Sequence, residues 1–226
     1  MPSRQLKKKG EKRKSDEGLA KRARSILARL RKHRPGARIE LDFTNPLELL
    51  VATILSAQCT DKRVNEVTRA LFRKYRTAAD YAAADILTFQ EEIRPTGFYR
   101  NKAKAIIAAA QKLLAEFDGE APRSMEEMLT LPGVARKTAN VVLGNAYAIA
   151  TGIVVDTHVG RVARRLGLTK QKQPDKIEQD LMKLYPQKDW IEASTQLVLH
   201  GRYICTARNP GCSQCPVEKL CPKIGV

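Results

Sequence analysis

The sequence predicts an all-α protein. Apolar residues recur every three or four positions through most of the chain, which is the spacing of one helix face. Helix-capping residues precede these stretches, and Gly or Pro follows them. The one strand-like run, residues 153–155, is too short to build a sheet. With 226 residues, the chain can form one large domain or two smaller ones.

The expected helices follow one another along the chain. A first amphipathic helix starts near Leu19 and ends at the stretch 33–36, which contains Pro and Gly. A very apolar helix follows Asn45, a good capping residue, and has Pro46 at its first position. The other expected helices begin at Asp61, at Asn101 and after Pro174, and a last one spans about Trp190 to Tyr203.

One stretch predicts two helices joined by a tight turn. Ser124 and Glu127 form a capping signature for the first helix, which must end at Pro132-Gly133. The second helix begins near Ala135 and carries Lys137 in its first turn. Free backbone amides at its N-terminus suit a phosphate group. An ordinary helical corner with a solvated lysine explains the same local features equally well.

The charge of the chain points to a polyanionic partner. The net charge is +17, and residues 1–34 contain 14 Lys or Arg against three Asp or Glu. Such a balance favours nucleic acid, although a solubilising tail is the simpler alternative. Residues 1–18 are expected to form a disordered basic arm. The N-terminal residues contain no apolar segment and no apolar run reaches membrane-spanning length. We therefore expect a soluble monomer in the cytoplasm, associated with the nucleoid and with no membrane partner.

Four cysteines near the C-terminus predict a metal centre. In an intracellular chain, clustered cysteines favour metal binding over disulfides. Coordination by four thiolates fits either structural zinc or a [4Fe–4S] cluster, and the spacing alone leaves both open. The fifth cysteine, Cys59, lies in an apolar region and is expected to be a buried thiol. The candidate ligands are Cys205, Cys212, Cys215 and Cys221.

Several short motifs occur together in the order and spacing of one known family. They are Leu55–Asp61, Thr96–Ala103, Leu131–Ala139, Val155–His158 and the four-cysteine pattern. With this set, residues 20–222 resemble the endonuclease III family, which comprises base-excision repair glycosylases of the helix-hairpin-helix superfamily. Ala135 departs from the family pattern, which usually has a second hairpin glycine there. Cys59 departs from it as well, because a small residue is common at that position.

The resemblance implies an architecture of two helical lobes with DNA in the cleft between them. Residues 19–38 together with 150–226 would form the lobe that holds a [4Fe–4S] cluster. Residues 39–149 would form the helical bundle, with the helix-hairpin-helix motif at about 124–147. Among the four-thiolate alternatives, the resemblance therefore selects iron over zinc.

The resemblance also implies an activity, that of a bifunctional DNA glycosylase/AP lyase. Such an enzyme removes oxidised pyrimidines from duplex DNA and cleaves 3′ to the abasic site by β-elimination. The amine of Lys137 would attack the sugar and form a Schiff base, while Asp156 would stabilise positive charge on the sugar. Asp156 could instead serve only as the N-cap of the helix that follows it.

Further residues are expected to contact double-stranded DNA that contains damaged pyrimidines or abasic sites. By analogy with the family, Gln58 enters the gap left by the extruded base and Phe98 presses on the opposite strand. Without the family, Phe98 would be interpreted as a core residue. Arg208 is a candidate phosphate contact. The remaining expected contacts are Gly133, Val134, Ala135, Arg136, Thr138 and His158.

Three alternatives remain open from the sequence. An adenine-removing mismatch glycosylase shares the fold, but Lys137 and the end of the chain at Val226 argue against it. A thymine or uracil mismatch glycosylase would be distinguished by its substrate. A non-catalytic DNA-binding or electron-transfer protein with a cluster would not need Lys137 and Asp156. The sequence contains no Walker-type loop and no zinc-protease motif, which excludes those two enzyme classes.

Overall fold

The computed structural model describes the backbone of residues 3–226 and the side chains from Asp16 onward. Within these residues all regular structure is helical and no strand occurs, which confirms the all-α prediction. The chain forms two compact units. Unit 1 comprises the residues up to Arg38 and residues 152–226, and unit 2 comprises residues 39–151. The division after residue 151 lies two residues beyond the expected one.

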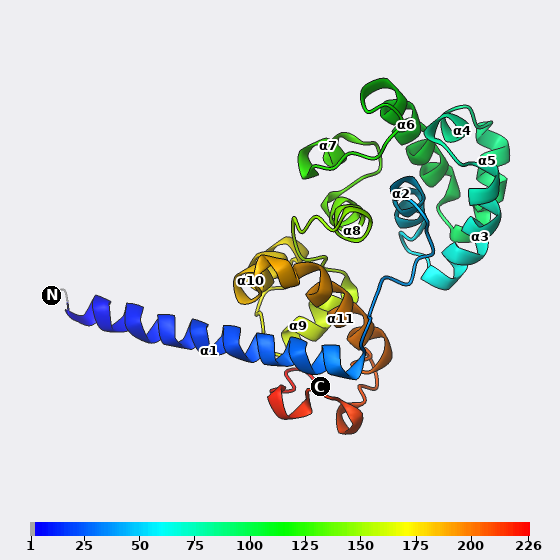
Figure 1. Ribbon diagram of the computed structural model, residues 1–226. Coiled ribbons are helices and arrows are strands. Elements are labelled where there is room, and N and C mark those ends of the chain that lie inside the picture. The colour runs from blue at the N-terminus through cyan, green and yellow to red at the C-terminus, as the bar shows by residue number, and fades with distance from the viewer. Residues whose placement is uncertain (1–2) are drawn as a thin grey trace. The chain divides into compact units, whose positions relative to one another are not determined.

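Unit 1 is built around one apolar face of its first helix. Ala23, Ile26, Leu27 and Leu30 on this face are at most 3 % exposed, and they share a core with residues of the three later α-helices. In Figure 1 the C-terminal half of the first helix lies along two of these helices, while its N-terminal half projects past them. The elements of unit 1 are α1 (Ser3–His33), α9 (Thr157–Arg165), α10 (Pro174–Leu184), η2 (Gln187–Asp189), α11 (Trp190–Tyr203), η3 (Cys212–Gln214) and η4 (Glu218–Leu220).

The first helix is longer than the sequence predicts. It begins at Ser3 and includes most of the segment 1–18, so the expectation of a disordered arm is wrong for residues 3–18. These residues contain no proline and are rich in Lys, Arg and Glu, all of which have high helix propensity. The first two residues of the expected arm, Met1 and Pro2, lie outside the described residues. The C-terminal end at His33 agrees with the prediction.

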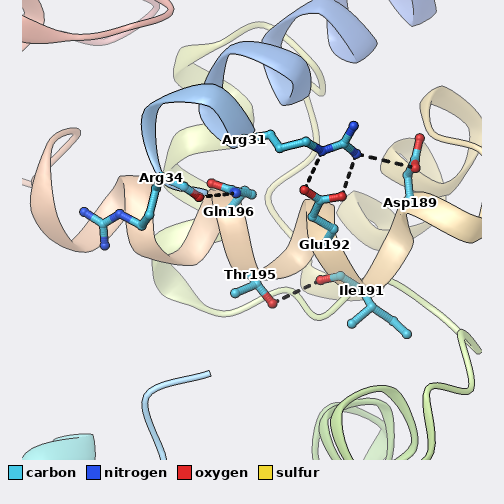
Figure 2. A network of polar contacts seen from close by, with 7 residues as sticks. All are labelled: Arg31, Arg34, Asp189, Ile191, Glu192, Thr195 and Gln196. Carbon is cyan, nitrogen blue, oxygen red and sulfur yellow. Dashed lines mark hydrogen bonds and ion pairs between the residues drawn. The ribbon is translucent and has the colours of Figure 1, made fainter. Parts of the chain in front are cut away.

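Polar contacts fasten the end of α1 to α11 (Figure 2). The guanidinium of Arg31 donates two hydrogen bonds of 2.6 Å to the carboxylate of Glu192 and lies 3.8 Å from Asp189. Beyond the helix end, the amide of Gln196 donates to the carbonyl of Arg34 at 3.0 Å. These contacts fix the rotation of α1 about its axis, which keeps its apolar face toward the core.

Unit 2 is organised around its longest helix, which packs against three others (Figure 1). Its core includes an aromatic trio in which Tyr75 stacks on Tyr81 and both meet Phe89 edge to face. The elements of unit 2 are α2 (Pro46–Leu55), α3 (Asp61–Lys74), α4 (Ala78–Ala82), α5 (Ile86–Ile93), η1 (Arg94–Thr96), α6 (Tyr99–Glu116), α7 (Met125–Thr130) and α8 (Arg136–Tyr147). The longest helix is α6, and it contacts α2, α4 and α5.

The capping residues explain most helix starts in unit 2. The side chain of Asn45 accepts a hydrogen bond from the amide of Glu48 at 2.9 Å, as predicted for the start of α2. The sequence does not predict the short helices α4 and α5 individually, and each begins at a cap, Thr77 and Asp85 respectively. α6 begins two residues before the expected Asn101. None of the helices within residues 3–226 has the length and apolarity needed to span a bilayer.

Candidate functional site

The predicted hairpin is present between α7 and α8. The hydroxyl of Ser124 accepts a hydrogen bond from the amide of Glu127 at 3.2 Å and starts α7. The same hydroxyl donates to the Glu127 carboxylate at 2.8 Å, so this carboxylate does not complete the reciprocal capping box. α7 ends at Thr130, and the carbonyl of the next residue, Leu131, accepts from the amide of Val134 at 3.1 Å to close the turn.

Two positions of the hairpin differ in their need for glycine. Gly133 has φ = +76°, and a Cβ added there would lie only 2.7 Å from the Cβ of Ala105 in α6. Both the left-handed backbone and the close approach therefore require glycine. Ala135 has φ = −95° and ψ = 169°, an extended conformation that any residue adopts. Its departure from the family pattern thus causes no backbone strain.

Lys137 lies where an anionic ligand can reach it. It is exposed in the first turn of α8 and makes no hydrogen bond or ion pair with any side chain from Asp16 onward. No side chain caps this helix, so its first amides remain free for a phosphate. Among the other predicted hairpin contacts, Arg136 is exposed and Thr138 is half-buried, while the side chain of Val134 is 7 % exposed. Val134 can therefore offer only its backbone to a ligand.

Asp156 is the N-cap of α9. One carboxylate oxygen, Oδ1, accepts from the amide of Val159 at 2.8 Å, which confirms the capping interpretation. The other oxygen, Oδ2, has no hydrogen-bond partner among residues 16–226. The half-buried carboxylate is thus held in one orientation while one of its oxygens stays available. The cap and a role in catalysis are therefore compatible.

The helix that Asp156 caps, α9, packs closely against α11. A Cβ at Gly201 would lie 2.8 Å from the Cβ of His158, so the two helices touch at this point. The ring Nδ1 of His158 is 3.2 Å from Arg161, which also donates to the carbonyls of Gly201 at 2.7 Å and Cys205 at 3.1 Å. His158 is half-buried and engaged inside unit 1.

Gln58 and Phe98 share an unusual backbone conformation in unit 2. Gln58 follows the end of α2 with φ = 54°, and Phe98 precedes α6 with φ = 50°. This left-handed region is strained for residues other than glycine. Both side chains are exposed to solvent, Phe98 by 61 %. The interpretation of Phe98 as a core residue is therefore wrong. Beside Gln58, the thiol of Cys59 is half-buried and not fully buried as expected.

The four C-terminal cysteines line one pocket together with Arg165 and His200. Arg165 donates to the sulfur of Cys205 at 3.4 Å, and the backbone amide of Lys223 donates to the sulfur of Cys221 at 3.3 Å. Arg165 also donates to the carbonyls of Thr206 and Ala207, which orders the segment between the first two cysteines. Arg208 is exposed on this segment, where a phosphate can reach it.

The chemistry of this pocket favours a soft metal centre. Burial raises the pKa of the thiols of Cys215 and Cys221, so thiolates there require a compensating cation. Burial also lowers the pKa of His200 to about 4, which keeps its ring neutral at pH 7. The ring Nε2 lies 3.7 Å from the sulfur of Cys215. Within residues 16–226 no three His, Cys, Asp or Glu side chains lie close enough together to hold a metal ion. The fit of the four cysteines to such a centre therefore rests on their residue type and on the pocket that they share.

The structure adds a buried lysine of α6 to the candidate residues, which the sequence analysis did not identify. Lys102, which belongs to the motif Thr96–Ala103, is 5 % exposed. Its ammonium donates to the carbonyls of Leu55 at 2.7 Å and Thr96 at 2.8 Å. Burial lowers its pKa, a property often found at functional residues. A lysine inside an apolar helix face is the sequence signal that could have identified it.

Comparison with known proteins agrees with this geometry. Residues 51–187 match the model of the HhH-GPD superfamily base excision DNA repair proteins. The chain is 57 % identical to endonuclease III of Synechocystis sp. over 201 residues, which cover 89 % of this chain and 92 % of that protein. It is 45 % identical to endonuclease III of Bacillus subtilis over 188 residues, covering 83 % and 85 % of the two chains.

The solved structures point the same way. A trapped covalent intermediate of endonuclease III with DNA superposes with a TM-score of 0.86 at 43 % identity, covering 90 % of this chain and 96 % of that one. A non-covalent endonuclease III–DNA complex gives the same TM-score and identity, with coverage of 90 % and 95 %. The match to the family model, the identity over most of the chain and the shared fold show that this chain belongs to the endonuclease III family of base-excision DNA repair enzymes.

Proposed function

We propose that this protein is a bifunctional DNA glycosylase/AP lyase that acts on oxidised pyrimidines and abasic sites in duplex DNA. The observation that carries the proposal is the exposed, unpaired Lys137 on the first turn of the hairpin helix, in a chain with this degree of identity to endonuclease III. A lysine in this position can reach a sugar whose phosphates are bound by the neighbouring amides. We further propose that it works as a monomer on DNA in the cytoplasm, at the nucleoid.

Binding begins with the phosphate backbone of DNA. The free amides at the start of α8, with the exposed Arg136 beside them, supply hydrogen-bond donors and positive charge. The backbone of Gly133 and Ala135 can approach a phosphate closely because both residues are exposed and neither has a long side chain. Arg208 and Thr138 would each add a contact to the phosphate backbone of the duplex. These contacts position the duplex without reading its sequence.

The damaged base must leave the stack before chemistry can occur. Gln58 and Phe98 would replace it, one filling the gap and the other pressing on the opposite strand. Both protrude on left-handed turns, so their backbone brings them out from the surface of unit 2. An apolar ring such as that of Phe98 is suited to wedge between bases.

Lys137 and Asp156 would then carry the reaction. The neutral amine of Lys137 attacks C1′ of the deoxyribose, and the bond from C1′ to the base breaks with its electron pair leaving on the base. The carboxylate of Asp156 stabilises the positive charge that develops on the sugar. Ring opening gives an imine between Lys137 and C1′. Loss of a C2′ proton then expels the 3′ phosphate by β-elimination, and water releases the enzyme.

We propose that Cys205, Cys212, Cys215 and Cys221 hold a [4Fe–4S] cluster. Four soft thiolates suit such a cluster, and when bound it would supply the folding energy that a segment with so few apolar residues lacks. Arg165 would orient the segment toward the cluster through its bonds to Cys205 and to the following carbonyls.

Metal analysis tests this assignment. We expect about four irons per chain and a brown protein after anaerobic purification. Replacing Cys212 by Ser should lower the iron content and loosen the segment, whereas replacing Cys59, which lies outside this pocket, by Ser should change neither. Zinc in place of iron would refute the assignment.

The nucleophile can be tested with two substitutions at one position. With a lesion duplex and borohydride, the wild-type protein should become covalently joined to DNA. Lys137→Ala and Lys137→Arg should both lose this product, because neither side chain can form the imine, while Lys137→Arg retains the charge and hence the affinity for DNA. Trapping of either variant at the wild-type rate would identify another amine as the nucleophile.

Asp156 needs a variant that retains the cap. Asn is a good capping residue, so Asp156→Asn should preserve the stability of α9 while removing the charge. We expect base removal to slow by about 10²- to 10⁴-fold, with a smaller loss on a preformed abasic site. A fully active Asp156→Asn protein would show that the charge is not needed and that the residue is only a helix cap.

A further inference from the structure

A buried lysine connects two turns of unit 2 that are distant in sequence. The ammonium of Lys102 donates to the carbonyl of Leu55, 47 residues earlier in the chain, and to the carbonyl of Thr96. With 5 % of its surface exposed, Lys102 is shielded from solvent and from any large ligand. Its amine therefore cannot reach a sugar, and it is not a rival nucleophile to Lys137.

Both carbonyls belong to helix ends. Leu55 is the last residue of α2, and the amide four positions on, that of Cys59, bonds to Ser56 instead. Thr96 is the last residue of η1. Carbonyls at a helix end lack an intrahelical partner and carry partial negative charge. One ammonium therefore satisfies the ends of two helices and neutralises the charge of both.

The two exposed turns follow directly from these helix ends. Gln58 lies three residues after Leu55, and Phe98 lies two residues after Thr96. Each has a positive φ, of 54° and 50°. Strained conformations of this kind persist only where the surroundings fix them. Lys102 also holds the Phe98 turn through its backbone, because its backbone amide donates to the carbonyl of Phe98 at 3.1 Å.

We propose that Lys102 is a positioning residue, whose ammonium holds the Gln58 turn and the Phe98 turn at a fixed separation so that both side chains enter the DNA together. The inference rests on the proposed function, because it takes Gln58 and Phe98 as the residues that replace the extruded base. Lys102 contacts neither DNA nor the reacting atoms. It acts on base extrusion alone, through the two carbonyls that it binds.

This role explains why a cation is retained in an apolar interior. A buried ammonium is unfavourable unless hydrogen bonds compensate it, and here it has two carbonyl acceptors that bind no other side chain of residues 16–226. A leucine or methionine would fill the same space but leave both carbonyls without this donor. The turns would then separate or collapse, and a displacement of about 1 Å in a positioned group can cost about 10²-fold in rate.

The test compares Lys102→Met with Lys104→Met. Lys104 lies two residues further along α6 and is exposed, and it has no hydrogen bond or ion pair with the described side chains, so both variants lose one positive charge from the same helix. Single-turnover base removal is measured on two duplexes. In one, a damaged pyrimidine is paired with a base. In the other it faces a chemically stable abasic analogue that the enzyme cannot cleave, so it has no pairing partner and needs little extrusion. The ratio of the two rates is insensitive to the folded fraction of enzyme, because unfolding lowers both rates equally.

Lys102→Met should slow base removal from the paired duplex by about 10- to 100-fold and from the unpaired one by less than about 3-fold. Lys104→Met should leave the ratio at the wild-type value. Lys102→Gln retains a donor that can reach one carbonyl, and it should lie between wild type and Lys102→Met. It also tests the proposal independently if Lys102→Met does not fold. Equal losses on both duplexes, in either Lys102 variant, would overturn the proposal and reduce Lys102 to a stabilising residue.

Two further variants distinguish a failure of this inference from a failure of the proposed function on which it rests. Gln58→Ala and Phe98→Ala should show the same preference for the unpaired duplex. If they do not, the assignment of the inserted residues fails, and with it the premise of the inference. If they do while Lys102→Met keeps the wild-type ratio, the inserted residues stand and the role of Lys102 is refuted. A wild-type protein inactive on both duplexes would refute the proposed function itself.

Discussion

Replacing Gly133 by alanine should destabilise unit 2 and weaken DNA binding, for two reasons that can be separated. The first is the backbone: φ is +76°, which alanine adopts with strain. The second is contact, because the new Cβ would lie 2.7 Å from the Cβ of Ala105, closer than methyl groups can approach. Ala105 lies within α6, so the hairpin must move away from that helix or α6 must shift.

The expected magnitude follows from adding the two effects. Left-handed backbone costs an L-residue about 1–2 kcal/mol, and forcing an extra methyl group into a packed contact costs about 1–3 kcal/mol. Gly133→Ala should therefore lower the free energy of unfolding by about 2–5 kcal/mol. Ala105→Gly removes the opposing methyl group and should cost about 1 kcal/mol through the lower helix propensity of glycine.

The double variant isolates the contact. With Ala105→Gly present, adding alanine at 133 should cost only the backbone strain of about 1–2 kcal/mol. The difference from the single variant, about 1–3 kcal/mol, is the coupling energy of a double-mutant cycle. Urea unfolding followed by helical circular dichroism gives all four free energies. Ala135→Gly is the matched control in the same turn, and it should change stability far less than Gly133→Ala does, because Ala135 is unstrained.

DNA binding supplies the second readout. A displaced hairpin moves the amides that bind phosphate, so Gly133→Ala should bind a lesion duplex about 10-fold more weakly, equivalent to about 1.4 kcal/mol, under conditions where it is folded. The double variant should recover most of this affinity. A cycle with no coupling energy would show that the hairpin and α6 do not touch as described, and normal binding by the single variant would remove the hairpin from the DNA interface.

Two other predictions concern α1. Deleting residues 1–18 should flatten the dependence of non-specific DNA affinity on salt. The log–log slope should fall by about 0.9 for each phosphate that the shortened chain no longer neutralises, while turnover at saturating DNA stays unchanged. An unchanged slope would show that this end of the helix only keeps the protein in solution. Arg31→Ala should lower the stability of unit 1 by about 0.5–1 kcal/mol at low salt, and by less in 1 M salt, since its two bonds to Glu192 are solvent-exposed. Lys32→Ala, on the same turn without such a bond, is the control for the removed charge.

Local features of the site can be predicted from the sequence because they depend on neighbouring residues. The cap at Asp156 and the turn at Gly133 each involve residues within four positions of one another. The helix from Trp190 to Tyr203 is predictable because its apolar periodicity is uninterrupted. Phe98 is a harder case, because its apolar ring suggests a core residue and the preceding Gly97 is the local sign of a turn.

Contacts between distant segments cannot be predicted in this way. The approach of Gly133 to Ala105 and the bond from Lys102 to Leu55 depend on how helices pack, and a single sequence records neither. The start of α1 at Ser3 escapes prediction for another reason. High charge density is typical of disordered segments, yet the same Lys, Arg and Glu residues have high helix propensity.

The discontinuity of unit 1 has a consequence for synthesis of the chain. Unit 2 is a single run of residues 39–151 and is complete as soon as that run has left the ribosome. α1 is made first, but its apolar face, with Ile26 and Leu27, finds its partners only in the helices after residue 152. At about 5–20 residues per second, the nascent helix waits roughly 6–25 s for them. During that interval the many Lys and Arg residues beside this face repel other copies of the nascent helix and so disfavour self-association.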